Sequence, residues 1–306
     1  MRKRQFLPDP AYRGRFAPSP TGPLHFGSLA AAVGSYLDAK HHQGTWLIRM
    51  EDLDTPRCVP GAAEDILHTL EAFGLHSDVP VLYQSQRTAA YEEALQQLRI
   101  IGATYPCCCT RREIADSALN GIEGPVYPGT CRNGIPAGRT GRAWRARTNN
   151  TAIAFDDVLQ GRISQRLESD IGDFVVKRAD GLFAYQLAVA VDDAFQHITH
   201  IVRGADLLYS TPRQIHLQRL LGLSTPTYMH LPVALNAQCE KLSKQTLAPA
   251  IGRDDVITTL VKALKFLQQQ PPAELREATV EQILLWGAAN WKPEKLAHCR
   301  QLPSDH

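Results

Sequence analysis

The chain has 306 residues, of which 44% are hydrophobic and 21% are charged, with a formal net charge of +2 at neutral pH. This is an ordinary globular composition, long enough for one large core or two modest ones. The near-neutral charge excludes a global positive field, so any contact with nucleic acid must come from local patches. The seven cysteines, three of them consecutive, do not form a disulfide framework and indicate a reducing compartment. No stretch has the ~20 apolar residues of a membrane helix, and we expect a cytoplasmic protein.

The first hundred residues alternate between strand and helix patterns. A short strand at 14–17 meets a loop rich in proline at 18–23, and an alanine-rich and leucine-rich helix follows at 24–41. The next predicted elements are a strand at 45–50 that ends in an acidic cluster, then helices at 60–73 and 87–101. This alternation predicts an α/β fold with a doubly wound, Rossmann-type parallel sheet.

The pattern changes at Tyr105, where cysteine, glycine and proline become frequent, and alternating stretches at 144–147 and 152–155 indicate a small inserted β subdomain. We expect the parallel-sheet pattern to resume at 173–176 and to continue through 184–191. A strand at 198–202 and helices at 212–221, 254–268 and 280–291 complete the prediction. The predicted domains are the first half of the catalytic domain at 13–104, the insert at 105–172, the second half at 173–235, and a loop with a helical segment at 236–306.

Two segments carry residues suited to phosphate chemistry. The first joins a strand to the start of a helix, where backbone N–H groups and the positive helix end favour an anion beside His25 and Gly27. The second, residues 241–245, places Lys241 and Lys244 three positions apart in a loop. Taken singly, the first is better explained as a turn with a capping histidine, and the second as a solvated surface turn.

Together these segments identify a resemblance to the glutamate-specific class I aminoacyl-tRNA synthetases. The HIGH signature of that family is present as His25-Phe26-Gly27-Ser28, and its KMSKS signature as Lys241-Leu242-Ser243-Lys244-Gln245. Ser28 and Gln245 depart from the usual residues. Further similar segments lie between the signatures in the order of the family, and the resemblance spans residues 13–250; these segments are residues 15–22, 49–54, 180–185, 189–193 and 198–206.

The resemblance implies a role for each matching residue. Arg15 and Arg203 would bind the two carboxylates of glutamate, Glu51 with Ser19 its amino group, and Tyr185 its side chain. His25, Gly27 and Lys244 would bind ATP with Mg²⁺, and the catalytic residues would be His25, Ser28, Lys241 and Lys244. Outside this motif context, each of these arginines and Glu51 would be a surface ion pair.

A Cys-x-Cys pair, Cys107 and Cys109, precedes a Tyr-x3-Cys pair, Tyr127 and Cys131. Spacing alone leaves buried free thiols as a fair alternative to a metal site. The same arrangement occurs in the short glutamyl-queuosine tRNA(Asp) synthetases, a branch of the family that this chain resembles. That resemblance implies a structural Zn²⁺ on these four side chains, with Cys108 as a spare thiol. We expect Cys58, Cys239 and Cys299 to be simply buried.

The short branch also indicates the acceptor. After the KMSKS-like loop about sixty residues remain, too few for the stem-contact and anticodon-binding domains of full-length glutamyl-tRNA synthetases. We therefore expect glutamate to be transferred to queuosine in the anticodon stem-loop of tRNA(Asp), with no obligate protein partner. The alternatives are a truncated enzyme that charges the 3′ end of tRNA, an idle paralogue that only binds, and a small nucleotidyltransferase.

One basic stretch could contact the RNA. Residues 125–155 contain no acidic side chain, and they include Trp144 and five arginines. Arginine neutralises phosphate and an aromatic ring stacks on an unpaired base, but a solvated loop and strand face explains the stretch equally well. The five arginines are Arg132, Arg139, Arg142, Arg145 and Arg147.

Overall fold

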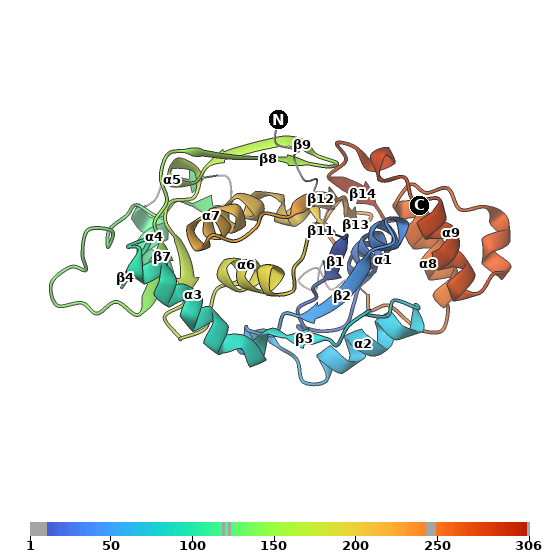
Figure 1. Cartoon of the computed structure of the whole chain (residues 1–306), viewed down its shortest axis with the longest axis horizontal. Coiled ribbons are helices and arrows are strands. Elements are labelled where there is room, and N and C mark those ends of the chain that lie inside the picture. The colour runs from blue at the N-terminus through green and yellow to red at the C-terminus, as the bar shows by residue number, and fades with distance from the viewer. Residues whose placement is uncertain (1–10, 118–119, 122–123, 243–248, 305–306) are drawn as a thin grey trace, which may run out of the picture.

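The computed structural model describes residues 11–117, 120–121, 124–242 and 249–304. Its centre is a seven-stranded sheet in the order β3-β2-β1-β11-β12-β8-β9 (Figure 1). All neighbouring strands are parallel except β8 and β9, which form an antiparallel hairpin at one edge. The strands are β1 (Arg13–Phe16), β2 (Thr45–Met50), β3 (Leu82–Tyr83), β8 (Ala152–Asp157), β9 (Gly161–Arg166), β11 (His200–Gly204) and β12 (Thr227–Leu231).

Strand order reverses between β1 and β11. The chain goes from β1 to β2 and β3 in one direction, whereas β11 and β12 extend the sheet in the other. Such a reversal opens a crevice at the carboxyl ends of the two central strands, where open α/β sheets bind their ligands. The fold thus predicts a site beside the loops that follow Phe16 and Gly204.

Helices cover both faces of this sheet. Trp46 and Ile48 belong to one buried cluster together with α1, α8 and α9, while the intervening Leu47 packs with α3, α6 and α7 in a second cluster. This division follows from the strand geometry, because successive side chains point to opposite faces. The helices are α1 (Phe26–His41), α2 (Ala62–Ala72), α3 (Thr88–Ile100), α6 (Tyr185–Phe195), α7 (Thr211–Leu221), α8 (Val256–Phe266) and α9 (Val280–Ala289).

A second, three-stranded antiparallel sheet lies at the end of the molecule opposite α8 and α9 (Figure 1). It consists of β10 (Phe174–Lys177), β7 (Ala143–Ala146) and β4 (Thr104–Cys107), with β7 in the middle. The three consecutive cysteines begin at the last residue of β4 and continue towards α4 (Arg111–Ser117).

The remaining elements are short. Two further sheets have two strands each, β5 with β6 and β13 with β14. A short helix follows β9, and 3₁₀ turns join several of the longer elements. They are β5 (Asn120–Gly121), β6 (Gly124–Pro125), α5 (Leu167–Asp170), β13 (Val233–Leu235), β14 (Gln301–Pro303), η1 (Thr55–Arg57), η2 (Gln84–Arg87), η3 (Ala205–Ser210), η5 (Ala273–Glu277) and η6 (Pro293–Leu296).

The sequence predicts the first half of the fold closely. The expected strand at 45–50 is confirmed as β2, and the four other elements expected before residue 102 are present with ends shifted by one or two residues. The strand at 198–202 and the helices at 212–221, 254–268 and 280–291 are present as β11, α7, α8 and α9.

Three expectations in the middle of the chain are wrong. The stretch at 152–155 lies in β8, which joins the main sheet beside β12 instead of an inserted one. The stretch at 173–176 lies in β10, an antiparallel strand of the small sheet, and residues 185–191 are helical in α6. For the two strands, partners far apart in the sequence decide the assignment, and an alternation pattern does not specify the partner. In the described residues, no helix is long and apolar enough to cross a bilayer.

Candidate functional site

A cleft of about 460 Å³ lies at the point where the strand order reverses. The loop after β1, the start of α1, the end of β11 and the segment around β13 form its walls. Eight of the residues singled out from the sequence line it: Arg15, Ser19, His25, Gly27, Ser28, Tyr185, Arg203 and Lys241. Segments as far apart in the sequence as Arg15 and Lys241 thus meet in one cavity.

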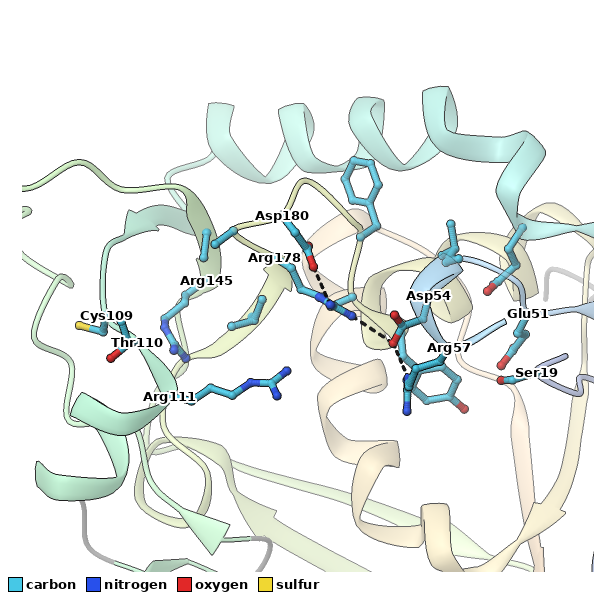
Figure 2. A pocket seen from close by; sticks show the side chains of 18 of the residues that line it. Ser19, Glu51, Asp54, Arg57, Cys109, Thr110, Arg111, Arg145, Arg178 and Asp180 are labelled. Atoms are coloured by element: carbon cyan, nitrogen blue, oxygen red, sulfur yellow. Dashed lines mark hydrogen bonds and ion pairs between the residues drawn. The ribbon is translucent and has the colours of Figure 1, made fainter. Parts of the chain in front are cut away.

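A neighbouring cleft of about 570 Å³ begins at the same place. Ser19 and Tyr185 line both clefts, and Glu51 lines the second. The second cleft extends from these residues towards Cys109 and Thr110 (Figure 2). The two clefts are therefore adjacent spaces that meet at the residues expected to bind an amino acid.

His25 caps the first helix. Its Nδ1 accepts a hydrogen bond from the backbone N–H of Ser28 at 3.3 Å, and its Nε2 lies 3.0 Å from the Ser28 hydroxyl. A Cβ atom on Gly27 would lie 3.3 Å from the His25 ring and 3.5 Å from Ala234, so glycine keeps this corner open. The predicted capping role of His25 is present, and Ser28 is the residue that the imidazole contacts.

Arg15 is held from behind by a buried acid. Its guanidinium donates to Asp193 of α6 through Nε at 3.0 Å, and Asp193 also accepts a hydrogen bond from Arg49 at 2.7 Å. Arg49 in turn donates to Glu51 at 3.2 Å. All four side chains are at least 92% buried, so two cations and two carboxylates form one compact group. Buried charges of this kind are held by mutual pairing.

The pKa values of the two carboxyl groups in this cluster are shifted in opposite directions. Burial disfavours the charged form of Asp193, but Arg15 and Arg49 outweigh it and lower the pKa of Asp193. Burial raises the pKa of Glu51 in spite of Arg49 and Arg15. Asp193 therefore stays ionised as the anchor of the arginines, while Glu51 is ready to pair with one more positive group.

Arg203 is the second cation at the cleft. Its Nη2 donates to the Thr211 hydroxyl at 2.9 Å, and its Nη1 lies 3.5 Å from the Tyr185 hydroxyl. Its Nε donates to the imidazole of His230 at 3.1 Å. Arg15 and Arg203 thus reach one cavity from β1 and β11, as expected for a ligand with two carboxylates.

The KMSKS-like segment lies partly within the described residues. Lys241 lines the smaller cleft and forms an ion pair with Asp206 at 2.6 Å. Lys244 and Gln245 lie outside the described residues. The chain that follows returns to the helix start, because Ala250 forms a β-bridge with His25 and the Ile251 N–H donates to the Leu24 carbonyl at 2.9 Å. The two signatures are therefore neighbours in space.

The larger cleft is crossed by an ion-pair chain (Figure 2). Asp54 accepts from Arg57 at 2.6 Å and lies 3.1 Å from Arg178, which also pairs with Asp180 at 2.6 Å. Beyond this chain, Arg111 extends into the cleft close to the cysteine end. The cleft therefore has acidic and basic groups in its middle and a cation at its far end.

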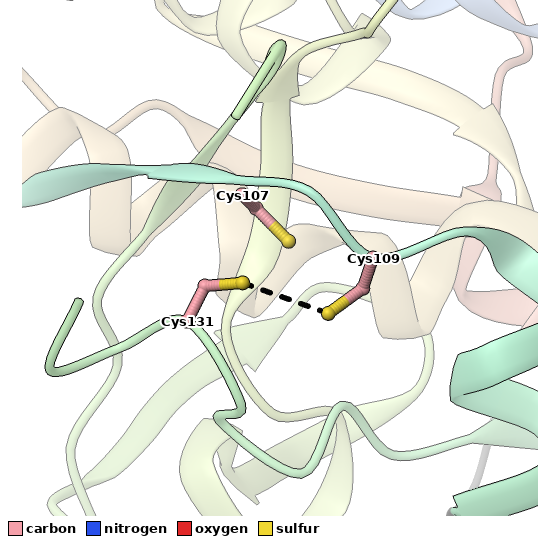
Figure 3. Close-up of side chains that lie close together, drawn as sticks. All are labelled: Cys107, Cys109 and Cys131. Atoms are coloured by element: carbon pink, nitrogen blue, oxygen red, sulfur yellow. Dashed lines mark hydrogen bonds between the residues drawn. The ribbon is translucent and has the colours of Figure 1, made fainter. Parts of the chain in front are cut away.

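Cys109, which lines this end of the cleft, lies together with two other thiols (Figure 3). The sulfur atoms of Cys107, Cys109 and Cys131 lie within 4.8 Å of one another, and Cys109 and Cys131 are 3.6 Å apart. The Tyr127 hydroxyl lies 3.4 Å from the Cys107 sulfur and 3.7 Å from that of Cys109. The four side chains predicted from the sequence are thus in one cluster, with the Cys108 sulfur 3.5 Å from that of Cys131.

The other three cysteines are not fully buried. Cys239 is exposed, and Cys58 and Cys299 are partly exposed. The expectation of burial is therefore wrong, and most clearly so for Cys239. This residue lies in a turn after β13 with a φ of +61°, and a surface turn does not enclose its side chain.

The basic stretch is largely used within the protein. Arg145 donates to the Cys107 sulfur at 3.2 Å and covers the Tyr127 ring, while Arg132 pairs with Asp173. Arg139 pairs with Glu113, and the guanidinium of Arg147 covers the Tyr105 ring. Most of these arginines therefore stabilise the region around the small sheet and the thiols, which we call the cysteine subdomain (residues 105–147 and 167–177), and a contact with RNA stays a prediction.

Sequence reasoning missed the groups that lie behind the site. Asp193 and Arg49 fall inside segments that carried the resemblance, but no role was assigned to them. His230 and Asp157 were not singled out at all. Their signal in the sequence is weak, because each is a polar residue near the end of a short strand and belongs to no motif, so only tertiary pairing explains it.

Two solved structures with similar folds are a glutamate tRNA ligase and a glutamate-tRNA synthetase. A glutamate tRNA ligase from Elizabethkingia meningosepticum, solved in complex with its amino acid, superimposes with a TM-score of 0.77 and 23% identity, covering 96% of this chain and 67% of that one. The glutamate-tRNA synthetase of Elizabethkingia anophelis gives 0.78 and 23%, covering 96% and 68%. At this identity the likeness shows the fold.

The sequence comparisons are closer. The family described as tRNA synthetases class I (E and Q), catalytic domain, matches residues 11–286. The glutamyl-Q tRNA(Asp) synthetase of Dechloromonas aromatica is 62% identical over 282 residues, 92% of this chain and 94% of that protein. The enzyme of the same name from Chromobacterium violaceum is 57% identical over 293 residues, 95% and 98% of the two chains. The chain therefore belongs to the class I tRNA synthetases for glutamate and glutamine, and within them to the glutamyl-Q tRNA(Asp) synthetases.

Proposed function

We propose that this chain activates L-glutamate with ATP and transfers it to the queuosine base of tRNA(Asp). The observation that carries the proposal is the single cavity that joins Arg15 and Arg203 to the His25 corner and Lys241. A ligand with two carboxylates fits the two guanidinium groups, and a nucleotide fits the helix start. The family to which the chain belongs supports the same reaction.

In the glutamate pocket, Arg15 and Arg203 each bind one carboxylate, and Glu51 with Ser19 binds the ammonium group. Ser19 and Tyr185 line both clefts, so the bound amino acid would lie where they meet. Glutamine in place of glutamate leaves one guanidinium facing a neutral amide instead of a carboxylate ligand, which costs more than the loss of a neutral hydrogen bond. Selection for glutamate thus follows from charge.

ATP would bind with its phosphates at the start of α1, where His25 and the helix end attract negative charge. The α-carboxylate of glutamate attacks the α-phosphorus, the bond to pyrophosphate breaks, and glutamyl-adenylate forms. Mg²⁺ bound to the phosphates lowers their charge. Lys241, and Lys244 outside the described residues, would offset the charge on the departing pyrophosphate.

The acceptor would enter through the larger cleft. It opens directly from Ser19 and Tyr185, and its 570 Å³ suits a nucleobase with a substituent. A hydroxyl of the queuosine ring would attack the activated carbonyl, and AMP would leave. Arg111 at the far end is exposed and suits a phosphate of the anticodon stem-loop. The subdomain that begins at residue 105 would form one wall of this path.

A structural Zn²⁺ fits the cysteine cluster. Tetrahedral coordination with Zn–S bonds of about 2.3 Å places sulfur atoms about 3.8 Å apart, and an oxygen ligand about 3.5 Å from sulfur. The distances between Cys109 and Cys131 and from Tyr127 to its two thiols, 3.6, 3.4 and 3.7 Å, agree with this geometry. Arg145 would offset the excess negative charge of three thiolates. Zn²⁺ would tie β4 to the loop that carries Tyr127.

Exchange of labelled pyrophosphate into ATP tests the activation step. We expect exchange with glutamate, and at least about a hundredfold less with glutamine or aspartate. Arg203→Ala should nearly abolish the exchange. Arg162→Ala is the matched control, because Arg162 is exposed and pairs only with Asp156 across the β8–β9 hairpin among the described residues. Equal exchange with glutamine would contradict the proposed pocket.

A further inference from the structure

Behind Arg203, on the side away from the cleft, lies a buried pair of titratable groups. His230 of β12 is fully buried, and Asp157 of β8 is 3% exposed. The imidazole Nδ1 lies 2.6 Å from the Asp157 carboxylate, and its Nε2 accepts from Arg203 at 3.1 Å. The three side chains thus form a chain across three neighbouring strands, β8, β12 and β11.

The positions of the protons in this chain follow from its donors. A guanidinium Nε always carries hydrogen, so His230 Nε2 must be the acceptor and its Nδ1 must carry the proton that is donated to Asp157. Burial lowers the pKa of His230 to about 4, although Asp157 acts in the opposite direction. The histidine is therefore a neutral ring with one fixed tautomer.

The backbone fixes the orientation of Asp157. The carboxylate Oδ1 accepts from the N–H groups of Leu159 and Gln160 at 3.1 and 2.9 Å, in the turn between β8 and β9. The other oxygen, Oδ2, is thereby directed to His230. The β8–β9 hairpin, which sequence reasoning assigned to the inserted subdomain, thus sets the tautomer of a histidine in the main sheet.

The chain of contacts determines which edge of Arg203 faces the ligand. His230 takes the Nε–H, and Thr211 takes Nη2 at 2.9 Å, which leaves Nη1 beside Tyr185 at the cleft. Arg15, by contrast, is bound directly by the carboxylate of Asp193. A neutral acceptor orients a guanidinium without placing an anion in contact with it. The positive charge of Arg203 is therefore less compensated by His230 than it would be by a carboxylate, and it attracts a carboxylate ligand more strongly.

We infer that Asp157 and His230 are positioning residues for glutamate binding. They hold Arg203 with its Nη1 edge in the cleft, and no carboxylate among the described residues forms an ion pair with its guanidinium. The inference rests on the proposed function, because it takes the ligand of Arg203 to be a carboxylate of glutamate. Neither residue touches the substrate, and both act through the guanidinium.

Asp157→Asn tests the inference with little change of shape. The amide oxygen still accepts from Leu159 and Gln160, and the amide nitrogen donates to His230 Nδ1. His230 must then carry its proton on Nε2, where it opposes the N–H of Arg203. We expect the KM for glutamate in pyrophosphate exchange to rise at least about tenfold, with the KM for ATP within about twofold of the wild type.

A second pair of variants separates orientation from stability. The His230→Gln side chain can still accept a hydrogen bond from Arg203, whereas that of His230→Leu cannot. We therefore expect His230→Gln to retain most of the glutamate affinity and His230→Leu to lose it. In the His230→Gln background, Asp157→Asn should have little further effect on the glutamate KM, because no imidazole tautomer remains to be reversed. Full additivity of the two substitutions would contradict the inference.

The outcomes for the inference and for the proposed function are distinct. Wild-type protein without glutamate-dependent exchange refutes the proposed function, and the inference falls with it. Active wild type with an unchanged glutamate KM in Asp157→Asn overturns the inference alone. A rise of both KM values together with a lower Tm would mean that the pair only stabilises the fold, and this also contradicts the inference.

Discussion

At the scale of single residues, the site consists of charged groups held by other buried charged or polar groups. Asp193 binds Arg15 and Arg49, and His230 binds Arg203. Arg15 and Arg203 line the smaller cleft, whereas Arg49 lines neither cleft. Glu51 differs, because burial dominates its environment and the cation it contacts, Arg49, is shared with Asp193. It is therefore the group whose charge an incoming ammonium would stabilise most.

Glu51 leads to a prediction about pH. Its raised pKa means that it gains a proton at a higher pH than an ordinary carboxyl does, and the protonated form cannot pair with an ammonium. Glutamate affinity, measured by calorimetry, should fall as the pH is lowered towards this pKa. Glu51→Gln should bind glutamate at least about tenfold more weakly and lose this dependence.

The matched control for this measurement is Glu71→Gln, since Glu71 is exposed on α2 and lines neither cleft. It should keep both the affinity and the pH profile of the wild type. An unchanged pH profile in Glu51→Gln would show that another group binds the ammonium.

At the scale of elements, the cysteine subdomain depends on a close approach of two loops. Gly172 follows α5 with a φ of +74° and forms a β-bridge with Tyr127. A Cβ at this position would lie 2.5 Å from the Tyr127 carbonyl oxygen and 2.8 Å from its nitrogen. Glycine therefore permits both the turn and the position of the proposed fourth zinc ligand.

Gly172→Ala should consequently destabilise the protein and displace Tyr127. Gly222→Ala is the control, because Gly222 has a similar φ of +66°, whereas a Cβ added there would meet no atom of the described residues within 4 Å. The control should cost about 1 kcal/mol for the backbone strain alone, and Gly172→Ala at least about 2 kcal/mol more. Equal losses in chemical denaturation would mean that the contact with Tyr127 is not tight.

The metal proposal is tested on the same subdomain. Protein purified with Zn²⁺ should hold about one ion per chain, measured by elemental analysis, and Cys131→Ser should lose it with a lower Tm. Cys299→Ser should keep both properties, because Cys299 lies near β14, far from the cluster in the sequence, and contacts Gln301. Full stability of the wild type after removal of all metal would contradict a structural role.

At the scale of the whole molecule, the elements with local signals could be predicted from the sequence. The strand, loop and helix around His25 are contiguous, and the Cys-x-Cys and Tyr-x3-Cys spacings place the four side chains of the cluster in two short segments. The pairing of β8 with β12 brings together Asp157 and Tyr228, which are far apart in the chain. The sequence of neither strand indicates which strand it pairs with. The contact of His230 with Asp157 depends on that pairing, so it could not be predicted.

The topology of the sheet also determines where the two clefts lie. The reversal of strand order places the smaller cleft, which is the proposed amino-acid and nucleotide pocket, at the centre of the sheet, and the larger cleft leads from it to the cysteine subdomain. Activation and transfer would thus occur on either side of Ser19 and Tyr185. The acceptor would approach from the side of the cysteine subdomain, where Arg111 is exposed.

The most direct test of the central claim supplies labelled glutamate, ATP and tRNA, and then locates the label after the RNA is cut. We expect the label on the anticodon fragment of tRNA(Asp), and none when the tRNA comes from cells that do not make queuosine. Label on the 3′-terminal adenosine, independent of queuosine, would contradict the proposed transfer and indicate an enzyme that charges the tRNA end. No label on any RNA, with intact pyrophosphate exchange, would contradict the transfer step alone.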